Sequence, residues 1–147
     1  RERSLLLPRV SWRQWLLSLP FPLRCRAAWD PQLLTQLLKI FPAAIGMRLR
    51  AMAEMRGLRS ARHWWVTVVQ RCGGALNLNV HFHSMVADGV WVDSPRGPRF
   101  GPLRITEDDV RWVVCRVWRR ALRLPAVRDL LVADEEDFAE ESFMDEV

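Results

Sequence analysis

The sequence predicts an α+β fold, and three observations support this prediction. Hydrophobic and polar residues alternate strictly over residues 76–83, as they do along a half-buried strand. Apolar residues recur at helical spacing from Leu33 to Met52. A glycine pair at positions 73 and 74 separates two stretches that are rich in β-branched and aromatic residues. The chain therefore combines helices with strands that are joined by turns.

The first expected elements are a strand and a long helix. The stretch "WRQWLLSLP" (residues 12–20) has the bulk and length of a mostly buried strand, and the prolines around its end are expected to stop it. Asp30 is a suitable N-cap for the helix that follows, and Pro31 suits its first position. The apolar stripe of this helix ends at Gly57, and Pro42 inside it is expected to kink or split the helix.

The second half of the chain is expected to form a hairpin, a short strand and a second helix. The stretch "WWVTVVQ" (residues 64–70) predicts a strand that turns back into the alternating residues 76–83. Another short strand, at residues 90–93, follows a glycine. Thr106 is expected to cap a second helix that ends before Pro125. The apolar stripe of this helix contains Val110, Val113, Val114, Val117, Trp118, Ala121 and Leu122.

Charge divides the chain into a basic domain and an acidic tail. Residues 1–133 contain all 22 Lys and Arg against nine acids, and residues 134–147 contain eight acids and no base, so the net charge is +13 − 8 = +5. We expect one domain over residues 1–133 and a disordered tail. Since 21 of the 22 bases are Arg, whose guanidinium group suits phosphates, a polyanionic partner is indicated. A GC-rich coding sequence would explain the arginines equally well.

Cysteine use and hydropathy indicate a cytoplasmic protein. Cys25, Cys72 and Cys115 are far apart and form no CxxC pair, so we expect buried thiols in a reducing compartment. No apolar run approaches the roughly 18 residues that a membrane helix needs, and no signal peptide is visible. The sequence starts at Arg1 and contains no Tyr, which suggests a segment of a longer protein.

The tripeptide "HFH" is the strongest candidate for a functional motif. Side chains alternate along a strand, so His81 and His83 are expected on one face and Phe82 in the core on the other. Two imidazoles whose Cα atoms are ~6.5 to 7 Å apart can converge on one ion and leave coordination positions open for a phosphate oxygen and water. Ordinary polar alternation on a half-exposed strand is the alternative interpretation, and the tripeptide alone does not exclude it.

The wider sequence around this motif carries a family resemblance. The stretch "VTVVQRCGGALNLNVHFHSMVADGVWV", with "RQWLLSLPFPLR" at residues 13–24 and "DPQLL" at residues 30–34, resembles the two-tyrosine rolling-circle transposases of bacterial insertion sequences. These belong to the His-hydrophobe-His endonucleases, and the resemblance covers most of residues 8–125. It implies an antiparallel sheet of about four to five strands flanked by helices. It also implies that His81 and His83 bind a divalent ion, Mg²⁺ or Mn²⁺.

The same resemblance implies a chemistry and a partner. The ion would polarise a scissile phosphate in single-stranded DNA, and a tyrosine hydroxyl would attack the phosphorus to leave a 5′-phosphotyrosine. Single-stranded DNA and a full-length transposase are the implied partners, and the protein would associate with the bacterial nucleoid through DNA. This chain lacks the tyrosine and the Cys-rich zinc segment of its relatives. We therefore expect an incomplete copy; a non-cleaving DNA-binding module and a decayed remnant are the alternatives.

A third metal ligand is usual in this superfamily and is often Gln, Glu or His. Gln70 is the first candidate, because it ends the strand that is expected to neighbour the histidines. Asp88 is the second, although strict alternation places it on the face of Phe82, so that it would need a bulge to reach the ion. His63 is the third.

DNA contacts are expected from two groups of residues. The second helix carries an arginine stripe that can neutralise phosphates, and the histidine face carries two asparagines that can bind bases or sugars. These candidates are Arg116, Arg119, Arg120, Arg123, Asn77 and Asn79. Trp64, Trp65 and Trp91 either stack on unpaired bases or cover the sheet as structural residues.

Overall fold

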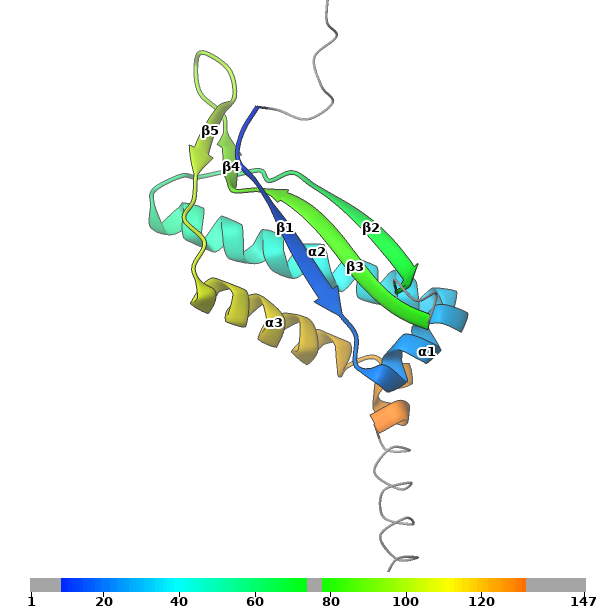
Figure 1. The fold of residues 1–147 in the computed structure, drawn as a ribbon. Helices are drawn as coiled ribbons and strands as arrows, with labels where there is room; N and C mark the ends of the chain where they lie inside the picture. The colour runs from blue at the N-terminus through cyan, green and yellow to red at the C-terminus, as the bar shows by residue number, and fades with distance from the viewer. Residues whose placement is uncertain (1–8, 74–77, 132–147) are drawn as a thin grey trace, which may run out of the picture.

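The computed structural model describes residues 9–73 and 78–131, and these residues form an α+β fold (Figure 1). The predicted fold class is therefore confirmed. The elements are β1 (Trp12–Ser18), α1 (Phe21–Trp29), α2 (Pro31–Met55), β2 (Trp65–Cys72), β3 (Leu78–Ala87), β4 (Gly89–Val92), β5 (Arg99–Pro102) and α3 (Glu107–Ala121), with a further short helix at residues 125–131. The acidic tail at residues 134–147 lies outside the described residues.

The strands form two sheets instead of the single sheet that was expected. β3 is the central strand of an antiparallel three-stranded sheet with the order β1-β3-β2, and β4 pairs with β5 in a separate hairpin. The hairpin begins at Gly89, where an added Cβ would lie 2.4 Å from the carbonyl oxygen of Gly101. The two strands of the hairpin therefore approach each other too closely at Gly89 for a residue with a side chain. The hairpin extends beyond the end of the main sheet (Figure 1).

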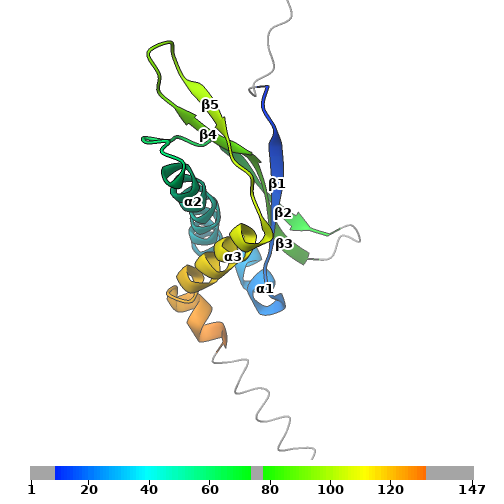
Figure 2. The same ribbon diagram turned by 90° about the vertical axis from the view of Figure 1, so that its left-hand side faces the viewer.

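The three-stranded sheet has one covered face and one open face. Phe82, Val80 and Val86 of β3 are almost completely buried on the face that α2 and α3 cover (Figure 2). His81 and His83 alternate with these residues and lie on the opposite face. Residues 78–83 therefore alternate between the two faces of the sheet as the sequence predicted, with Phe82 inward and both histidines outward. Leu78 is the exception, since it belongs to the apolar set but is exposed at the start of the strand.

The helix α2 is continuous over 25 residues and is not split at Pro42. Proline removes one hydrogen bond from a helix, but Phe41 and Ile45 on either side of Pro42 are buried, so core packing holds the neighbouring turns. Asp30 is the N-cap, and its Oδ1 accepts hydrogen bonds from the backbone N–H groups of Gln32 and Leu33. Neither α2 nor another helix of the described part has the length and apolar character to cross a membrane.

The sequence analysis missed α1, a nine-residue helix directly after β1. Pro20 occupies its N-cap, and Pro22 lies in its first turn. The fixed backbone angle of proline and its missing N–H group are tolerated there, so a proline that ends a strand can also start a helix. Leu23 and Ala27 bury the inner side of α1.

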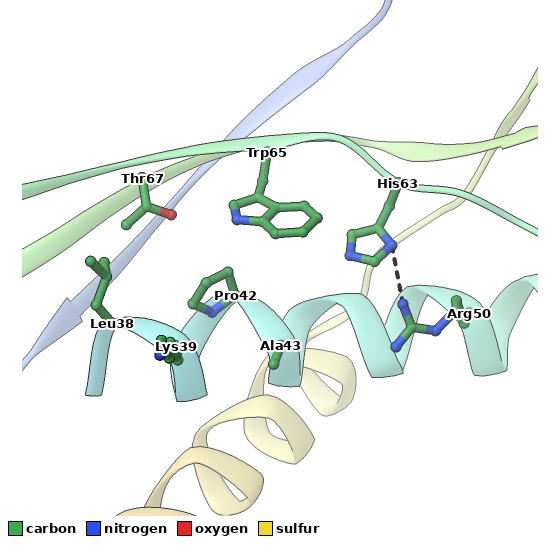
Figure 3. Close-up of a pocket in the computed structure, with 8 residues that line it drawn as sticks. All are labelled: Leu38, Lys39, Pro42, Ala43, Arg50, His63, Trp65 and Thr67. Carbon is green, nitrogen blue, oxygen red and sulfur yellow. Dashed lines mark hydrogen bonds between the residues drawn. The ribbon is translucent and has the colours of Figure 1, made fainter. Parts of the chain in front are cut away.

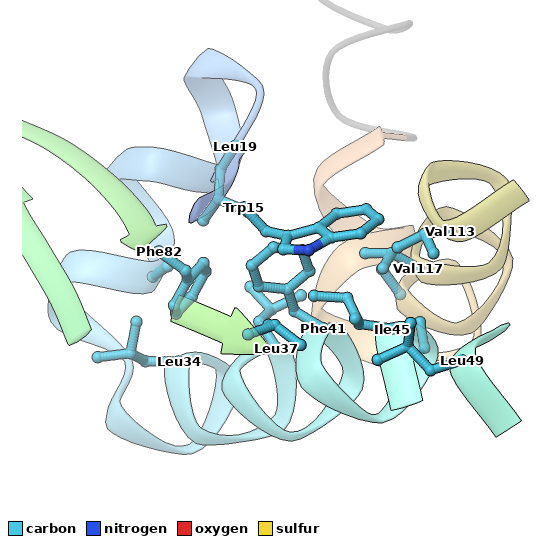
Figure 4. Packing of buried hydrophobic residues seen from close by; sticks show 14 of the residues in the cluster. Trp15, Leu19, Leu34, Leu37, Phe41, Ile45, Leu49, Phe82, Val113 and Val117 are labelled. Carbon is cyan, nitrogen blue, oxygen red and sulfur yellow. The ribbon is translucent and has the colours of Figure 1, made fainter. Parts of the chain in front are cut away.

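The core lies between the sheet and the helices (Figure 4). Trp15 and Phe82 from the sheet meet the helical layer, and α3 contributes Val113 and Val117. Only part of the predicted stripe of α3 is buried, because its residues Val110, Val114 and Trp118 are exposed. The prediction assumed that the whole apolar side of α3 is covered. In the structure α3 packs mainly against α2, which covers only part of that side.

An ion pair joins the two long helices. Arg48 of α2 lies 2.6 Å from Asp109 of α3, which is buried and also accepts hydrogen bonds from the backbone and side chain of Thr106. Burial opposes the ionisation of Asp109, but the hydrogen bonds from Thr106 and Arg48 outweigh it and lower the pKa of this carboxyl. Asp109, which forms a capping box with the predicted N-cap Thr106, thereby also joins α3 to α2.

The three cysteines are exposed, contrary to the expectation that they are buried. Cys25 lies on α1, Cys72 at the end of β2 and Cys115 on α3. Each of these elements has one solvent-facing side, and the cysteines fall on it. The prediction assumed that free cysteines are usually buried, but the position of each cysteine on its helix or strand decides whether it is exposed.

Replacing Phe82 by Ala tests the assignment of the two sheet faces. The ring of Phe82 is fully buried, so we expect the free energy of unfolding to fall by about 3 to 5 kcal/mol. Leu16→Ala is the matched control, because Leu16 is 58% exposed on the open face and its loss should cost at most about 0.5 kcal/mol. Urea denaturation measures both values, and equal losses would mean that the faces are wrongly assigned.

Candidate metal centre

Two histidines lie side by side on the open face of the central strand. The ring centroids of His81 and His83 are 4.8 Å apart, and the ring planes make an angle of 61°. The strand register places His81 between Ser18 of β1 and Gln70 of β2. His83 lies between two apolar residues, Leu16 and Val68. The shared face that the alternation predicted is therefore present, and residues of both neighbouring strands lie beside the two rings.

The surroundings of the histidines are accessible to a large ligand. Leu16 and Val68, which flank His83, are 58% and 60% exposed, and Val66 of the same face is 52% exposed. Both long helices pack on the other side of the sheet (Figure 2). In the described part of the chain, no helix covers the histidine face (Figure 2).

Hydrogen bonds to the Nδ1 atoms orient both rings. Nδ1 of His81 is 2.6 Å from the backbone oxygen of Asn79. A carbonyl oxygen only accepts, so Nδ1 of His81 donates, and in the neutral ring Nε2 keeps a lone pair for a metal. Nδ1 of His83 is 2.6 Å from the side-chain amide of Gln14. The oxygen and nitrogen of an amide are interchangeable by rotation, so Gln14 can accept from Nδ1 and free Nε2 of His83 in the same way.

One nitrogen of the pair is buried without a partner. Nε2 of His83 has no hydrogen bond within the described residues, and the same holds for Oδ1 of Asn79 nearby on the strand. An unsatisfied buried polar atom costs about 1 to 3 kcal/mol. A cation bound between the two imidazoles would satisfy Nε2 of His83. This orphaned nitrogen is the observation that best fits a metal at this position.

The donor set fits a divalent ion only in part. Two nitrogens that both bind one ion at ~2.1 Å lie at most ~4.2 Å apart. The centroids of the two imidazole rings are 4.8 Å apart, so small ring rotations can bring their nitrogens to this spacing. The described residues contain no group of three or more His, Cys, Asp or Glu side chains that could hold a metal. Mg²⁺ takes mainly oxygen ligands, so two imidazoles favour Mn²⁺ between the two expected ions. Water or a phosphate oxygen would complete the coordination.

Among the candidates for the third ligand, the structure places Gln70 nearest to the pair. Gln70 lies directly opposite His81 in the register, on the same face. Its side-chain nitrogen donates to the backbone oxygen of Cys72, at an irregularity of β2. Asp88 is held by an ion pair with Arg13, 2.9 Å long, and does not join the histidines. His63 lies on the helical side of the sheet.

His63 is packed between β2 and α2, away from the histidine pair (Figure 3). Its ring stacks on Trp65 with centroids 4.8 Å apart and planes 17° apart. The ring touches α2 at Gly46, where an added Cβ would lie 2.1 Å from Nε2 of His63. Burial and the charge of Arg50 lower the pKa of His63 to about 4. The ring is therefore neutral at pH 7 and accepts from the Arg50 guanidinium at 3.5 Å.

The residues expected to contact DNA do not form one surface. Arg119, Arg120 and Arg123 are exposed at the end of α3, on the helical side of the sheet, while Asn79 is on the histidine side. Arg116 is half-buried and donates to the sulfur of Met47 at 3.9 Å. Asn77 lies outside the described residues. The arginines of α3 and the histidine face would therefore contact different parts of a nucleic acid.

Gln14 is the site residue that the sequence analysis missed. It lies on β1 opposite Met85, two residue pairs away from His83 along the sheet and on the same face. Its side chain orients His83, which makes it a positioning residue for the candidate metal centre. Nothing in the local pattern of β1 marks Gln14, because its role arises from the register between two strands that are distant in sequence.

Comparison of the chain with family models, with curated proteins and with solved structures gave no match. The histidine pair, its hydrogen bonds and the charge of the chain are therefore the basis for a functional assignment.

The low pKa of His63 predicts a pH-dependent stability. Between about pH 6.5 and pH 4 the unfolded chain binds a proton at this residue and the native chain does not, so stability falls as the pH is lowered through this range. His63→Gln should flatten this dependence. Urea denaturation at several pH values measures it. If the profiles of the two proteins are parallel, His63 is not buried in neutral form.

Proposed function

We propose that this chain is the metal-binding core of an enzyme that nicks and joins single-stranded DNA, of the two-tyrosine rolling-circle transposase type. The observation that supports this proposal is the pairing of His81 and His83 on the open face of the central strand, with one buried nitrogen that has no hydrogen-bond partner among the described residues. The net charge of +13 over residues 1–133, which follows from 22 bases and nine acids, suits a polyanionic substrate. DNA transposition is the corresponding process.

The side chains of the site have separate tasks in this proposal. A bound Mn²⁺ or Mg²⁺ ion would supply Lewis acidity at a scissile phosphate. His81 and His83 hold the ion, and Gln70 is placed to add an amide oxygen. Gln14 and the backbone of Asn79 fix the ring orientations through the Nδ1 atoms. The uncovered face around the pair leaves room for the DNA strand, because the described helices pack on the other side of the sheet.

A second candidate function is a DNA-binding module that does not cut. The observation that favours it is the absence of tyrosine from all 147 residues, since transfer through a 5′-phosphotyrosine needs a phenol. Such a module would grip single-stranded DNA or compete with a full-length relative. The two functions differ in whether a tyrosine supplied from elsewhere converts binding into strand cleavage.

The metal proposal predicts binding of Mn²⁺ that depends on the histidine pair. Replacing both His81 and His83 by Ala should abolish the heat of binding in calorimetry, because both nitrogen ligands are lost, and should leave the circular dichroism spectrum unchanged. Gln14→Ala should weaken binding by roughly tenfold or more, because His83 loses its orienting partner. Val66→Ala, on the same face but paired with Met85 and not with a histidine, is the control and should bind normally. Equal binding by the wild type and the double variant would exclude this metal site.

The enzyme proposal also predicts what this chain does with DNA. Incubated with Mn²⁺ and single-stranded DNA, it should form no covalent adduct on a denaturing gel, because it has no phenol and water would be poorly placed as a nucleophile. Extension by a tyrosine-bearing helix from a transposase of this type should produce the adduct. His81→Ala in the extended protein should remove it again. An adduct formed by the present chain would show that another residue is the nucleophile.

A further inference from the structure

A cavity lies between α2 and the edge strand β2, on the side of the sheet away from His81 and His83 (Figure 3). We name it the α2–β2 cavity, and it has a volume of about 520 Å³. Its lining residues come from α2, from β2 and from the loop before β2: Leu38, Lys39, Pro42, Ala43, Arg50, His63, Trp65 and Thr67. A cavity of this size accommodates a ligand as large as a nucleotide.

The walls of the cavity are flat and mostly apolar. Trp65 projects from β2 towards Pro42 and Ala43 of α2, and it is 44% exposed (Figure 3). His63 covers one side of the indole by stacking, which fixes the orientation of the ring. Gly46 makes this possible, since a side chain there would collide with His63. A large aromatic ring that is held rigid and still exposed is suited to stack against another planar ring.

The charges at the cavity are all positive. Lys39 and Arg50 are eleven residues apart on α2, about 16 Å along the helix axis, so they lie towards opposite ends of the cavity. Within the residues that the structure describes, no acid lines the cavity, and neither cation forms an ion pair with a carboxylate. His63 adds no charge at neutral pH because burial lowers its pKa to about 4. Two uncompensated cations on either side of an aromatic wall suit a single strand that stacks one base on the wall and passes its phosphates along both cations.

We propose that the α2–β2 cavity binds an unpaired nucleotide of single-stranded DNA, with the base stacked on Trp65 and phosphates further along the same strand at Lys39 and Arg50. This inference rests on the proposed function, because it names a second contact for the same DNA. The edge strand β2 carries residues of both sites, with Gln70 beside His81 on one face and Thr67 at the cavity on the other. A strand that passes around this edge reaches the cavity and the histidine face.

The test is the binding of a labelled thymidine oligonucleotide of about 12 nucleotides, within the ~4 to 16 nucleotides that single-strand sites occupy. It is measured by anisotropy in a buffer with a chelator, so that no metal takes part. Trp65→Ala should weaken binding by roughly tenfold through the loss of one stacked base, and Trp65→Phe should restore most of it. Lys39→Gln and Arg50→Gln should each lower the slope of log affinity against log salt by about 0.7.

Two further variants separate a local effect from a general one. Trp29→Ala is the matched control, because Trp29 is 83% exposed on α1 and does not line the cavity, so binding should not change. Ala43→Phe fills the cavity without removing an existing group and should weaken binding as much as Trp65→Ala does. Equal binding by the wild type, Trp65→Ala and Ala43→Phe, each with an unchanged circular dichroism spectrum, would overturn the proposal.

The remaining outcomes distinguish this inference from the proposed function. If thymidine monophosphate binds as tightly as the oligonucleotide, the cavity is a site for a free nucleotide and the assignment to DNA is wrong. If the cavity variants bind normally but the double histidine variant loses Mn²⁺, the inference fails and the metal centre stands. If the cavity variants lose DNA and the histidines bind no metal, the inference stands and the proposed enzyme function fails.

Discussion

The burial of Phe82 against the helical layer is the constraint on which the rest of this structure depends. It fixes which face of β3 points inward, and because side chains alternate, it also fixes the outward position of His81 and His83. A slip of β3 by one residue would bury both imidazoles and expose the core residues. The central position of β3 adds to this constraint, since pairing with β1 and β2 on both sides holds the strand in register.

The outward face gains its specific character from the neighbouring strands. β1 supplies Gln14 to one ring, and β2 places Gln70 opposite the other. The backbone of β3 itself orients His81 through Asn79. The imidazoles are therefore not free surface residues but parts of a hydrogen-bonded arrangement in which Nε2 of His83 has no partner within the part of the chain that the structure describes. Polar alternation alone would not require such an arrangement, and this distinguishes the pair from two ordinary exposed histidines.

The helical side of the sheet depends on a different constraint, the close approach of α2 to β2. Small residues on α2 allow it: Gly46 accepts the ring of His63 against the helix, and Ala43 leaves space beside Trp65. The same approach leaves a cavity with Lys39 and Arg50 at its ends. Positive charge is thus distributed over several surfaces, including the exposed arginines at the end of α3, which lie on the helical side and not beside the histidines.

The sequence by itself determined the α+β class, the inward position of Phe82, the N-caps at Asp30 and Thr106 and the shared face of the histidines. These features follow from interactions within a few residues, namely strand alternation, helical spacing and capping, which leave a direct trace in the order of amino acids. The expected single sheet, the buried cysteines and a split of the helix at Pro42 were wrong, because these features depend on which elements pack together.

Only the tertiary structure decided the role of Gln14, the ion pair that removes Asp88 from the histidines, and the cavity between α2 and β2. Each of these brings together residues that are far apart in the chain. Gln14 is 69 positions from His83, and Arg13 is 75 positions from Asp88. A local pattern carries no information about such pairs, since strand register and helix packing set the distance between them.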